Sequence, residues 1–392
     1  MLSEILSRFK DHVTGTTLLS EQVLKYDAQF FMSNFNSDWD GISAAATDFT
    51  DAYFDKYPAI FHRDVFVERY DPNDFPPEKM ITFYLQKWMF DNLFVAQSID
   101  SVAGMKFKDA DVFLGVLADN APRITKVIEF EGSYATNPGY FLNDQKTVLR
   151  PSGLYIAPSE LVTLDFDEKA IGKGIIARVG LHRADLETTW TTFARFPRIS
   201  NTFSINQKQV KVANPFGGGL YFEVPDGTSL GKVRVTVTGA VKMPMYSTLD
   251  LQGHSADLDE FTADLALYQV PWFEITSKKF TTTQPINARN QATNPQGVLN
   301  VFDEMFDAIS LMTGRPLERI RSEWLTTDAQ VTVMNTAMAA SYPIFGNKAL
   351  SPPQETWDNN NLSWFEPWPH ADKDVFLQPT SVTKENNNAT LV

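Results

Sequence analysis

Three consecutive glycines feed directly into an alternating strand pattern in the stretch NPFGGGLYFEVP, residues 214–225. Glycine adopts positive φ angles without steric cost, so the backbone can turn tightly here or admit another group close to it. Residues 220–224 then alternate with the period of two that is typical of a β-strand. The stretch therefore predicts a tight turn that enters a strand, around which residues 151–245 are organised.

This glycine turn admits two interpretations. Glycine beside a strand commonly answers a steric demand inside the fold, and we favour this packing interpretation. In the alternative, the turn lies at the surface and lets a partner approach the backbone. The candidate ligand- or partner-binding residues of the turn are then Phe216, Gly217, Gly218, Gly219 and Tyr221.

The period of two extends over the middle of the chain. It is clear in residues 175–181 and 233–238, where successive side chains suit opposite faces of a sheet. Short strands separated by Gly, Pro, Asp and Asn at intervals of about ten residues are typical of an antiparallel β-sandwich. We expect this sandwich to occupy residues 127–280.

Helical spacing of apolar residues replaces this pattern toward the N-terminus. Residues 1–126 contain several amphipathic stretches, and one of them starts at Pro76–Pro77, where proline suits a first helical turn. The many aromatic side chains at helical spacing are expected to form core. These residues therefore predict a helical N-terminal domain.

Helical spacing also returns after residue 280. In the segment 294–314, Asn294 suits the cap, Pro295 the first helical position and Gly314 the terminator. The predicted fold class is thus α+β and multidomain. It combines a helical N-terminal domain, a central antiparallel β-sandwich and a mixed α/β C-terminal portion over residues 281–379.

Several separate stretches resemble, in the same order and spacing, the enhancin-like zinc metallopeptidases (peptidase family sixty), bacterial and viral proteases that attack mucin-type glycoproteins. Besides residues 214–225, these stretches are RPSGLYIAPSELVTLDF (150–166), GIIARVGLHRADL (174–186), FARFPRISNTFSI (193–205), GKVRVTVTGAVKMPMY (231–246) and QVPWFEI (269–275). The resemblance implies that the β-sandwich is the family's non-catalytic subdomain. It also implies that residues 281–379 open a catalytic-type subdomain, with 321–346 leading toward the zinc motif.

The zinc motif itself does not occur in this sequence. Such a protease needs HExxH on a helix, because two histidines one turn apart bind zinc and the glutamate acts as general base. No two of the five histidines are four residues apart; they are His12, His62, His182, His254 and His370. We therefore predict no catalytic and no metal-binding residues, and expect zinc only if a further C-terminal part carries HExxH.

Aromatic residues gather near the end of the chain. Trp357, Trp364 and Trp368 lie in a short stretch rich in Pro and Asn, and exposed aromatic rings of this kind can stack on sugars. In the alternative that we favour, they hold an irregular segment against the fold. Residues 380–392 are polar, rich in Asn and without apolar period, which predicts a disordered tail.

The charge and cysteine content exclude several classes of function. A net charge of −14 argues against binding to nucleic acid or to anionic membranes. The chain has no cysteine and therefore neither disulfides nor a thiolate metal site. No membrane-inserting stretch and no signal peptide are visible. The resemblance suggests an extracellular or cell-surface location, and the oligomeric state stays open.

Three functions are compatible with these observations. The favoured one is a secreted pseudoenzyme related to the enhancin-like peptidases, which binds a glycoprotein, its mucin-type carbohydrate or a protein partner without cleaving it. The second is an N-terminal fragment of an active secreted zinc metalloprotease that cleaves mucin-type glycoproteins. The third is a structural subunit of a larger particle.

Overall fold

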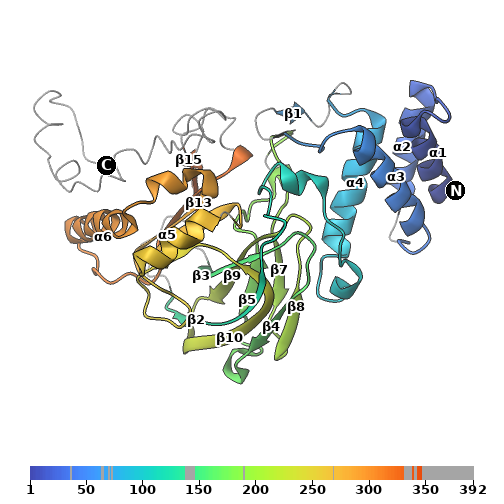
Figure 1. Ribbon diagram of the computed structural model, residues 1–392. Helices are drawn as coiled ribbons and strands as arrows, with labels where there is room; N and C mark the ends of the chain where they lie inside the picture. Colours follow the sequence, from blue (N-terminus) through green and yellow to red (C-terminus); the bar gives the residue numbers. More distant parts are fainter. Residues whose placement is uncertain are drawn as a thin grey trace, which may run out of the picture.

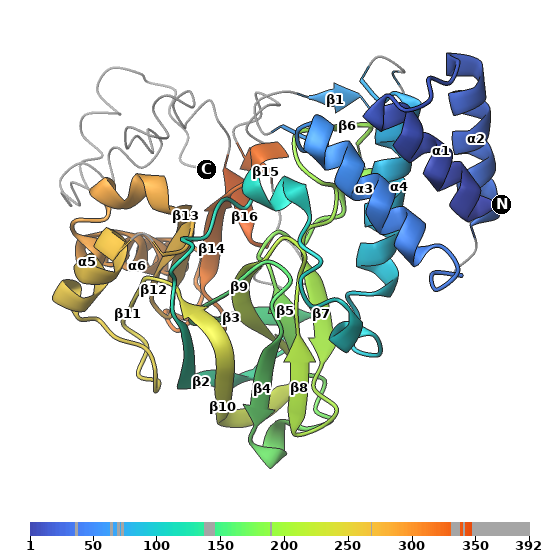
Figure 2. The same ribbon diagram turned by 45° about the vertical axis from the view of Figure 1, so that its right-hand side comes forward.

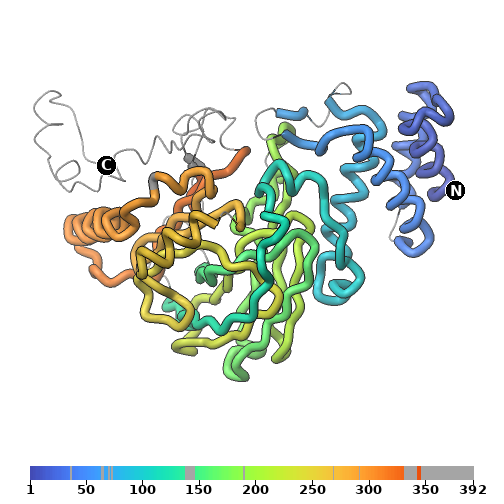
Figure 3. The backbone as a smooth tube through the Cα atoms, in the orientation of Figure 1, coloured from blue at the N-terminus to red at the C-terminus, as the bar shows by residue number. Residues whose placement is uncertain are grey.

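The computed structural model describes residues 1–35, 38–62, 66–68, 71, 74–136, 146–188, 190–267, 269–330, 338–339 and 342–346. A group of helices lies at one side, a strongly curved sheet lies in the middle, and a second sheet with two helices lies at the other side (Figure 1). Figure 3 follows the chain through these parts in that order. The predicted fold class, α+β with several parts, is confirmed.

The N-terminal part is helical, as predicted. Its helices are α1 (Leu2–Thr14), α2 (Glu21–Asn34), α3 (Ser43–Lys56) and α4 (Pro77–Asn92). Helix α4 starts at the predicted proline pair, because proline fits the first turn, where its missing N–H costs no hydrogen bond. The helices share a core that includes Phe9, Phe31 and Phe49, all fully buried. No helix among the described residues has both the length and the apolar character to cross a membrane.

The central part is one antiparallel sheet of eight strands that curls back on itself (Figure 2). The strand order is β7-β5-β9-β3-β10-β4-β8, and β2 pairs with β10. The long strand β10 thus pairs with β2, β3 and β4 and joins the two halves of the curl. The strands are β2 (Arg123–Tyr134), β3 (Thr147–Ile156), β4 (Val162–Phe166), β5 (Ile176–Val179), β7 (Asn201–Ser204), β8 (Gln209–Val212), β9 (Gly218–Pro225) and β10 (Thr228–Lys242).

Short elements connect these parts. Strands β1 (Val67–Glu68) and β6 (Thr192–Phe193) pair with each other. The 3-10 helices are η1 (Ile99–Ser101), η2 (Lys108–Asp111), η3 (Glu168–Ala170), η4 (Leu186–Thr188) and η5 (Ile286–Gln291).

The C-terminal part is a mixed sheet in the order β11-β12-β13-β14-β16-β15, with helices α5 (Leu258–Leu267) and α6 (Pro295–Met312). Helix α6 starts as predicted, because the Asn294 side chain accepts a hydrogen bond from the Gly297 N–H at 2.9 Å. The strands are β11 (Met245–Ser247), β12 (Trp272–Thr276), β13 (Phe280–Pro285), β14 (Glu323–Thr327), β15 (Met338–Ala339) and β16 (Ile344–Gly346).

Buried side chains form three apolar clusters: one within the N-terminal helices, one around the central sheet and one in the C-terminal part. The central cluster also takes in Phe61, Phe75 and Phe94, so the chain from residue 60 onward packs on the sheet. The boundary predicted between residues 126 and 127 falls inside β2. The division into domains of 1–126, 127–280 and 281–379 stays a prediction.

Buried polar contacts dock the C-terminal sheet on the central part. Arg195 donates two hydrogen bonds to the carboxylate of Asp328, at 2.8 and 2.9 Å, and both side chains are almost fully buried. Burial acts to raise the pKa of Asp328, but the charge of Arg195 holds it below its ordinary value. Gln330 accepts from the Ala194 N–H and donates to the Thr192 carbonyl, each at 2.9 Å. The two parts are therefore joined by an ion pair that is buried from solvent.

We expect Arg195→Met to lower the free energy of unfolding by about 3–5 kcal/mol, because it leaves the Asp328 carboxylate buried without its counter-charge. Adding Asp328→Leu should recover much of this loss, since the unpaired charge is then gone. Urea unfolding followed by tryptophan fluorescence measures both variants. Lys10→Met, which breaks an exposed ion pair with Asp48, is the control and should change little. Equal stability of the single and double variants would contradict the argument.

Candidate functional site

The predicted glycine turn lies inside the fold. Asn214 holds it, because its side-chain oxygen accepts from the Phe216 N–H at 2.8 Å and its amide donates to the carbonyls of Val179 and Ile199. A Cβ atom on Gly218 would lie 2.8 Å from the backbone of Gly180. The turn thus answers a steric demand between two strands of the sheet.

All five residues proposed for binding at this turn are buried: Phe216, Gly217, Gly218, Gly219 and Tyr221. This burial favours the packing interpretation, and a binding role for them stays a prediction. The other three candidates, Trp357, Trp364 and Trp368, lie outside the described residues, as do His370 and the predicted tail at 380–392.

Tyr221 belongs to a buried polar cluster between the two sheets. Its hydroxyl donates to Glu274 on β12 at 2.9 Å, and the Thr283 hydroxyl donates to the same carboxyl oxygen at 2.9 Å. The indole N–H of Trp324 donates to Thr283. Burial raises the pKa of Glu274 to about 7, so the carboxyl group is partly protonated at neutral pH.

His182 adds a second link between the sheets. Its Nε2 lies 2.8 Å from the Thr327 carbonyl oxygen, and its ring packs against Phe113, Trp272 and Phe345. Burial lowers the pKa of His182 to about 4, so the imidazole is neutral at physiological pH. This histidine therefore serves packing and docking.

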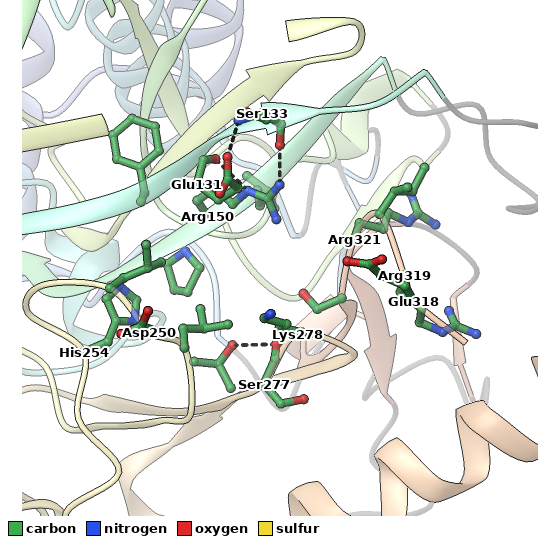
Figure 4. A pocket seen from close by; sticks show the side chains of 18 of the residues that line it. Glu131, Ser133, Arg150, Asp250, His254, Ser277, Lys278, Glu318, Arg319 and Arg321 are labelled. Atoms are coloured by element: carbon green, nitrogen blue, oxygen red, sulfur yellow. Dashed lines mark hydrogen bonds between the residues drawn. The ribbon is translucent and has the colours of Figure 1, made fainter. Parts of the chain in front are cut away.

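An open groove of about 590 Å³ lies between the central sheet and the C-terminal part (Figure 4). Its size is in the range of ligand sites. One wall comes from β2, β3 and the start of β10. The other wall includes the loop between β12 and β13 and the residues that lead into β14. Its charged lining residues are Glu131, Arg150, Lys232, Asp250, Lys278, Glu318, Arg319 and Arg321.

Arg150 lies at the central-sheet wall of the groove. It donates from Nε to the Glu131 carbonyl at 3.0 Å and from Nη2 to the Ser133 carbonyl at 2.9 Å. Arg150 is on β3 and both carbonyls are on β2, so this side chain joins two strand segments that share no backbone pairing there. Burial lowers the pKa of Arg150, which remains a cation at neutral pH.

The opposite wall carries two guanidinium groups that share one carboxylate. Arg319 donates to Glu323 at 2.9 Å, and an Arg321 nitrogen lies 3.7 Å from the other Glu323 oxygen. Each guanidinium carbon lies 4.3 Å from the centre of an aromatic ring, that of Phe306 for Arg319 and that of Tyr342 for Arg321. Stacking and ion pairing together hold both cations in place.

The remaining lining groups include an ion pair, an exposed lysine and a histidine. Lys232 pairs with Asp250 at 3.3 Å, and Lys278 is exposed at the rim. Burial lowers the pKa of His254 to about 4, and its Nδ1 lies 2.9 Å from the Ser247 hydroxyl. Asp257, near it in sequence, accepts hydrogen bonds from the first N–H groups of α5. Within the described part of the chain, no three His, Asp or Glu side chains are placed to hold a metal ion.

Sequence reasoning missed this groove. Its cationic residues lie at positions 150, 232, 278, 319 and 321, too far apart for any motif to join them. One signal was present, since Arg150 opens the stretch RPSGLYI, which is part of the resemblance. An arginine next to an apolar strand segment is costly to bury unless it is paired, and this could have marked Arg150.

Part of the chain matches a known protein family model. Residues 135–238 match the family model described as the N-terminal domain of M60-like peptidases, which confirms the resemblance to the enhancin-like peptidases. TRPM8 channel-associated factor 2 of Mus musculus is 29% identical over 209 residues, 53% of this chain and 21% of that protein. The TRPM8 channel-associated factor homolog of Xenopus laevis is 28% identical over 228 residues, 58% of this chain and 23% of that protein. The chain therefore spans about a fifth of the length of these curated relatives.

Among solved structures, the IMPa metallopeptidase from Pseudomonas aeruginosa is similar with a TM-score of 0.48 and 14% identity. The similar region covers 80% of this chain and 39% of that one.

The glycine turn yields one prediction. Gly218→Ala should lower the melting temperature by several degrees, because its φ of 143° is unfavourable for alanine and the new Cβ meets the Gly180 backbone. Gly172→Ala is the matched control: φ is also positive, at 69°, but no atom lies within 4 Å of the added Cβ. A loss no larger at Gly218 than at Gly172 would show that close packing is not what the turn requires.

The buried polar cluster around Glu274 yields a second prediction. Between pH 4.5 and 7 the folded chain holds a proton on Glu274 that the unfolded chain has lost, so this residue's contribution to stability falls as pH rises. Glu274→Gln removes this dependence while keeping an acceptor for Tyr221 and Thr283. The variant should gain about 1–3 kcal/mol relative to the parent between pH 5 and pH 8. Urea unfolding at both pH values measures it.

The exposed Glu168→Gln serves as the control for Glu274→Gln. Its stability difference from the parent should be nearly the same at the two pH values. A pH-independent difference for Glu274→Gln as well would show that the carboxyl group is ionised throughout.

Proposed function

Because residues 135–238 match the model of the N-terminal domain of M60-like peptidases, we propose that this chain acts as a non-catalytic binding component that holds a glycoprotein or protein partner. The groove carries the proposal. Arg150 and Lys232 in its walls come from the matched segment, whereas Lys278, Arg319 and Arg321 come from the following part. A partner in the groove would contact both.

The residues present support holding a partner. No HExxH occurs in the sequence, and the described residues offer no cluster of three metal-ligating side chains. The described lining of the groove contains five cations, three carboxylates, small polar groups and aliphatic side chains. Two similar proteins are named as channel-associated factors, which supports a protein partner for this chain as well.

A second candidate function follows from the coverage of the relatives. This chain matches about a fifth of each curated relative, so it also suits the role of one part of a longer protein. If a further part carries HExxH, the groove would hold substrate for a zinc peptidase built elsewhere in that protein.

The binding proposal predicts that the purified chain contains far less than one equivalent of zinc and cleaves neither casein nor mucin. It should still bind a mucin-type glycoprotein or a protein partner. Elemental analysis after dialysis against a weak chelator, peptidase assays and biolayer interferometry measure the three properties. Zinc near one equivalent together with cleavage would overturn a non-catalytic role.

A blocked groove tests where the partner binds. Ala135 is exposed and lines the groove, so Ala135→Trp should weaken partner binding by roughly tenfold or more through steric exclusion. Thr136→Trp is the matched control, because the neighbouring residue is also exposed but does not line the groove. Equal binding by the two variants would place the partner elsewhere.

A further inference from the structure

We propose that the groove binds an acidic peptide segment of a protein partner, whose Asp or Glu carboxylates lie between Arg150 and the Arg319–Arg321 pair. This inference rests on the proposed binding function and names the chemistry of the partner. It follows from the charge of the groove, from the way its guanidinium groups are held and from the character of its apolar lining.

The groove has the opposite charge to the chain that contains it. Five cationic side chains and three carboxylates line it, which leaves an excess of two positive charges. The whole chain carries −14. Positive charge concentrated in a concave surface of an acidic protein favours an anionic group there, because low-dielectric walls focus the field.

The guanidinium of Arg150 is fixed before any ligand arrives. Its two hydrogen bonds go to main-chain carbonyls of β2, so they set the plane of the group without neutralising its charge. A guanidinium has five N–H donors, and these two bonds leave others for a further acceptor. The Glu131 carboxylate nearby acts to raise the pKa of Arg150, but one of its oxygens already accepts from the Ser133 N–H at 2.9 Å.

The facing wall also presents guanidinium groups whose positions are fixed. Arg319 and Arg321 both pair with Glu323 and stack on Phe306 and Tyr342, and Lys278 adds a further cation at this side of the groove. Figure 4 shows Arg150 on one side of the groove and Arg319 and Arg321 on the other, with Lys278 in view between them. A ligand with carboxylates along its length could meet both walls, and planar guanidinium groups suit carboxylates.

The apolar lining distinguishes a peptide from a sugar. Sugar rings commonly stack on exposed aromatic faces. The one aromatic side chain in the described lining is Phe130, which is 1% exposed. Leu149 and Pro151 in the lining are buried too, so the accessible apolar surface is aliphatic and comes mainly from Leu249, Leu251, Pro316 and Ile320. Aliphatic surface beside guanidinium groups suits the side chains of an acidic peptide.

A polyanion is the less suitable occupant. The surface outside the groove is acidic, so a long phosphate backbone would be repelled wherever it left the groove. A peptide with a few carboxylates can leave its other residues neutral.

Fluorescence anisotropy with a labelled ten-residue peptide tests the proposal. The probe alternates Asp and Glu with Leu and Ser, and its matched control has Asn and Gln in place of the acids. The full chain should bind the acidic peptide at least tenfold more tightly than the amide peptide at 50 mM salt. Raising the salt to 300 mM should weaken the acidic peptide several-fold, because rim charges are screened. Equal binding of the two peptides would overturn the proposal.

Charge variants then locate the site. Lys278→Glu should weaken the acidic peptide by roughly tenfold, because it places a carboxylate at the rim. Lys173→Glu is the charge-matched control at an exposed position outside the groove and should change binding less than twofold. Arg150→Gln should abolish binding, and its melting temperature shows whether the chain still folds. Equal effects of Lys278→Glu and Lys173→Glu would overturn the placement even if Arg150→Gln cannot be purified.

A carboxylate-bearing oligosaccharide, 3′-sialyllactose, separates this inference from the proposed function. If the oligosaccharide binds, Ala135→Trp blocks it and the acidic peptide does not bind, the acidic-peptide inference is wrong and the binding function stands. If neither the acidic peptide, the oligosaccharide nor a mucin-type glycoprotein binds, both are wrong.

Discussion

The ion pair between Arg195 and Asp328 fixes how the C-terminal sheet sits on the central sheet. Both charges are buried, so neither can be left without the other at an acceptable cost in free energy. Two further hydrogen bonds cross the same interface, one between His182 and Thr327 and one between Tyr221 and Glu274. They constrain the relative orientation of the two parts. Because hydrogen bonds depend on angle as well as distance, these contacts favour the observed arrangement of the two sheets. The groove depends on that arrangement, since its two walls come from different parts of the fold.

The sequence predicted the local structure of those elements whose signals lie within the element itself. Helix α6 carries its cap at Asn294, proline at its first position and glycine after its end, and the structure uses all three. The alternation in β10 likewise predicted a strand, because Val233, Val235 and Val237 are fully buried on one face. Such signals act within a few residues, so they need no knowledge of the rest of the fold.

Local sequence signals of this kind did not predict the candidate site. The alternation over residues 220–224 predicted a strand but did not show that both of its faces are covered, so that Tyr221 and Glu223 are buried as well. Tyr221 meets Glu274 and Glu223 meets Arg178, so polar side chains on a covered face found buried partners. The groove brings together residues more than 80 positions apart in the sequence, such as Arg150 and Lys232. Sequence order carries no signal for such a meeting.

The pKa values of the described groups also bear on whether the groove suits binding or catalysis. General acid–base catalysis needs a group with a pKa near neutrality at the reacting atoms. In the described part of the chain, burial raises the pKa of Glu274 to about 7 and that of Asp109 to about 6, but both side chains are fully enclosed and neither lines the groove. Asp109 accepts from the N–H groups of Ile60 and Phe61, and Glu274 joins the two sheets. The described lining of the groove instead carries five cationic side chains, three carboxylates and the buried, neutral His254; under the proposed function, this excess of cations would attract and orient an anionic partner.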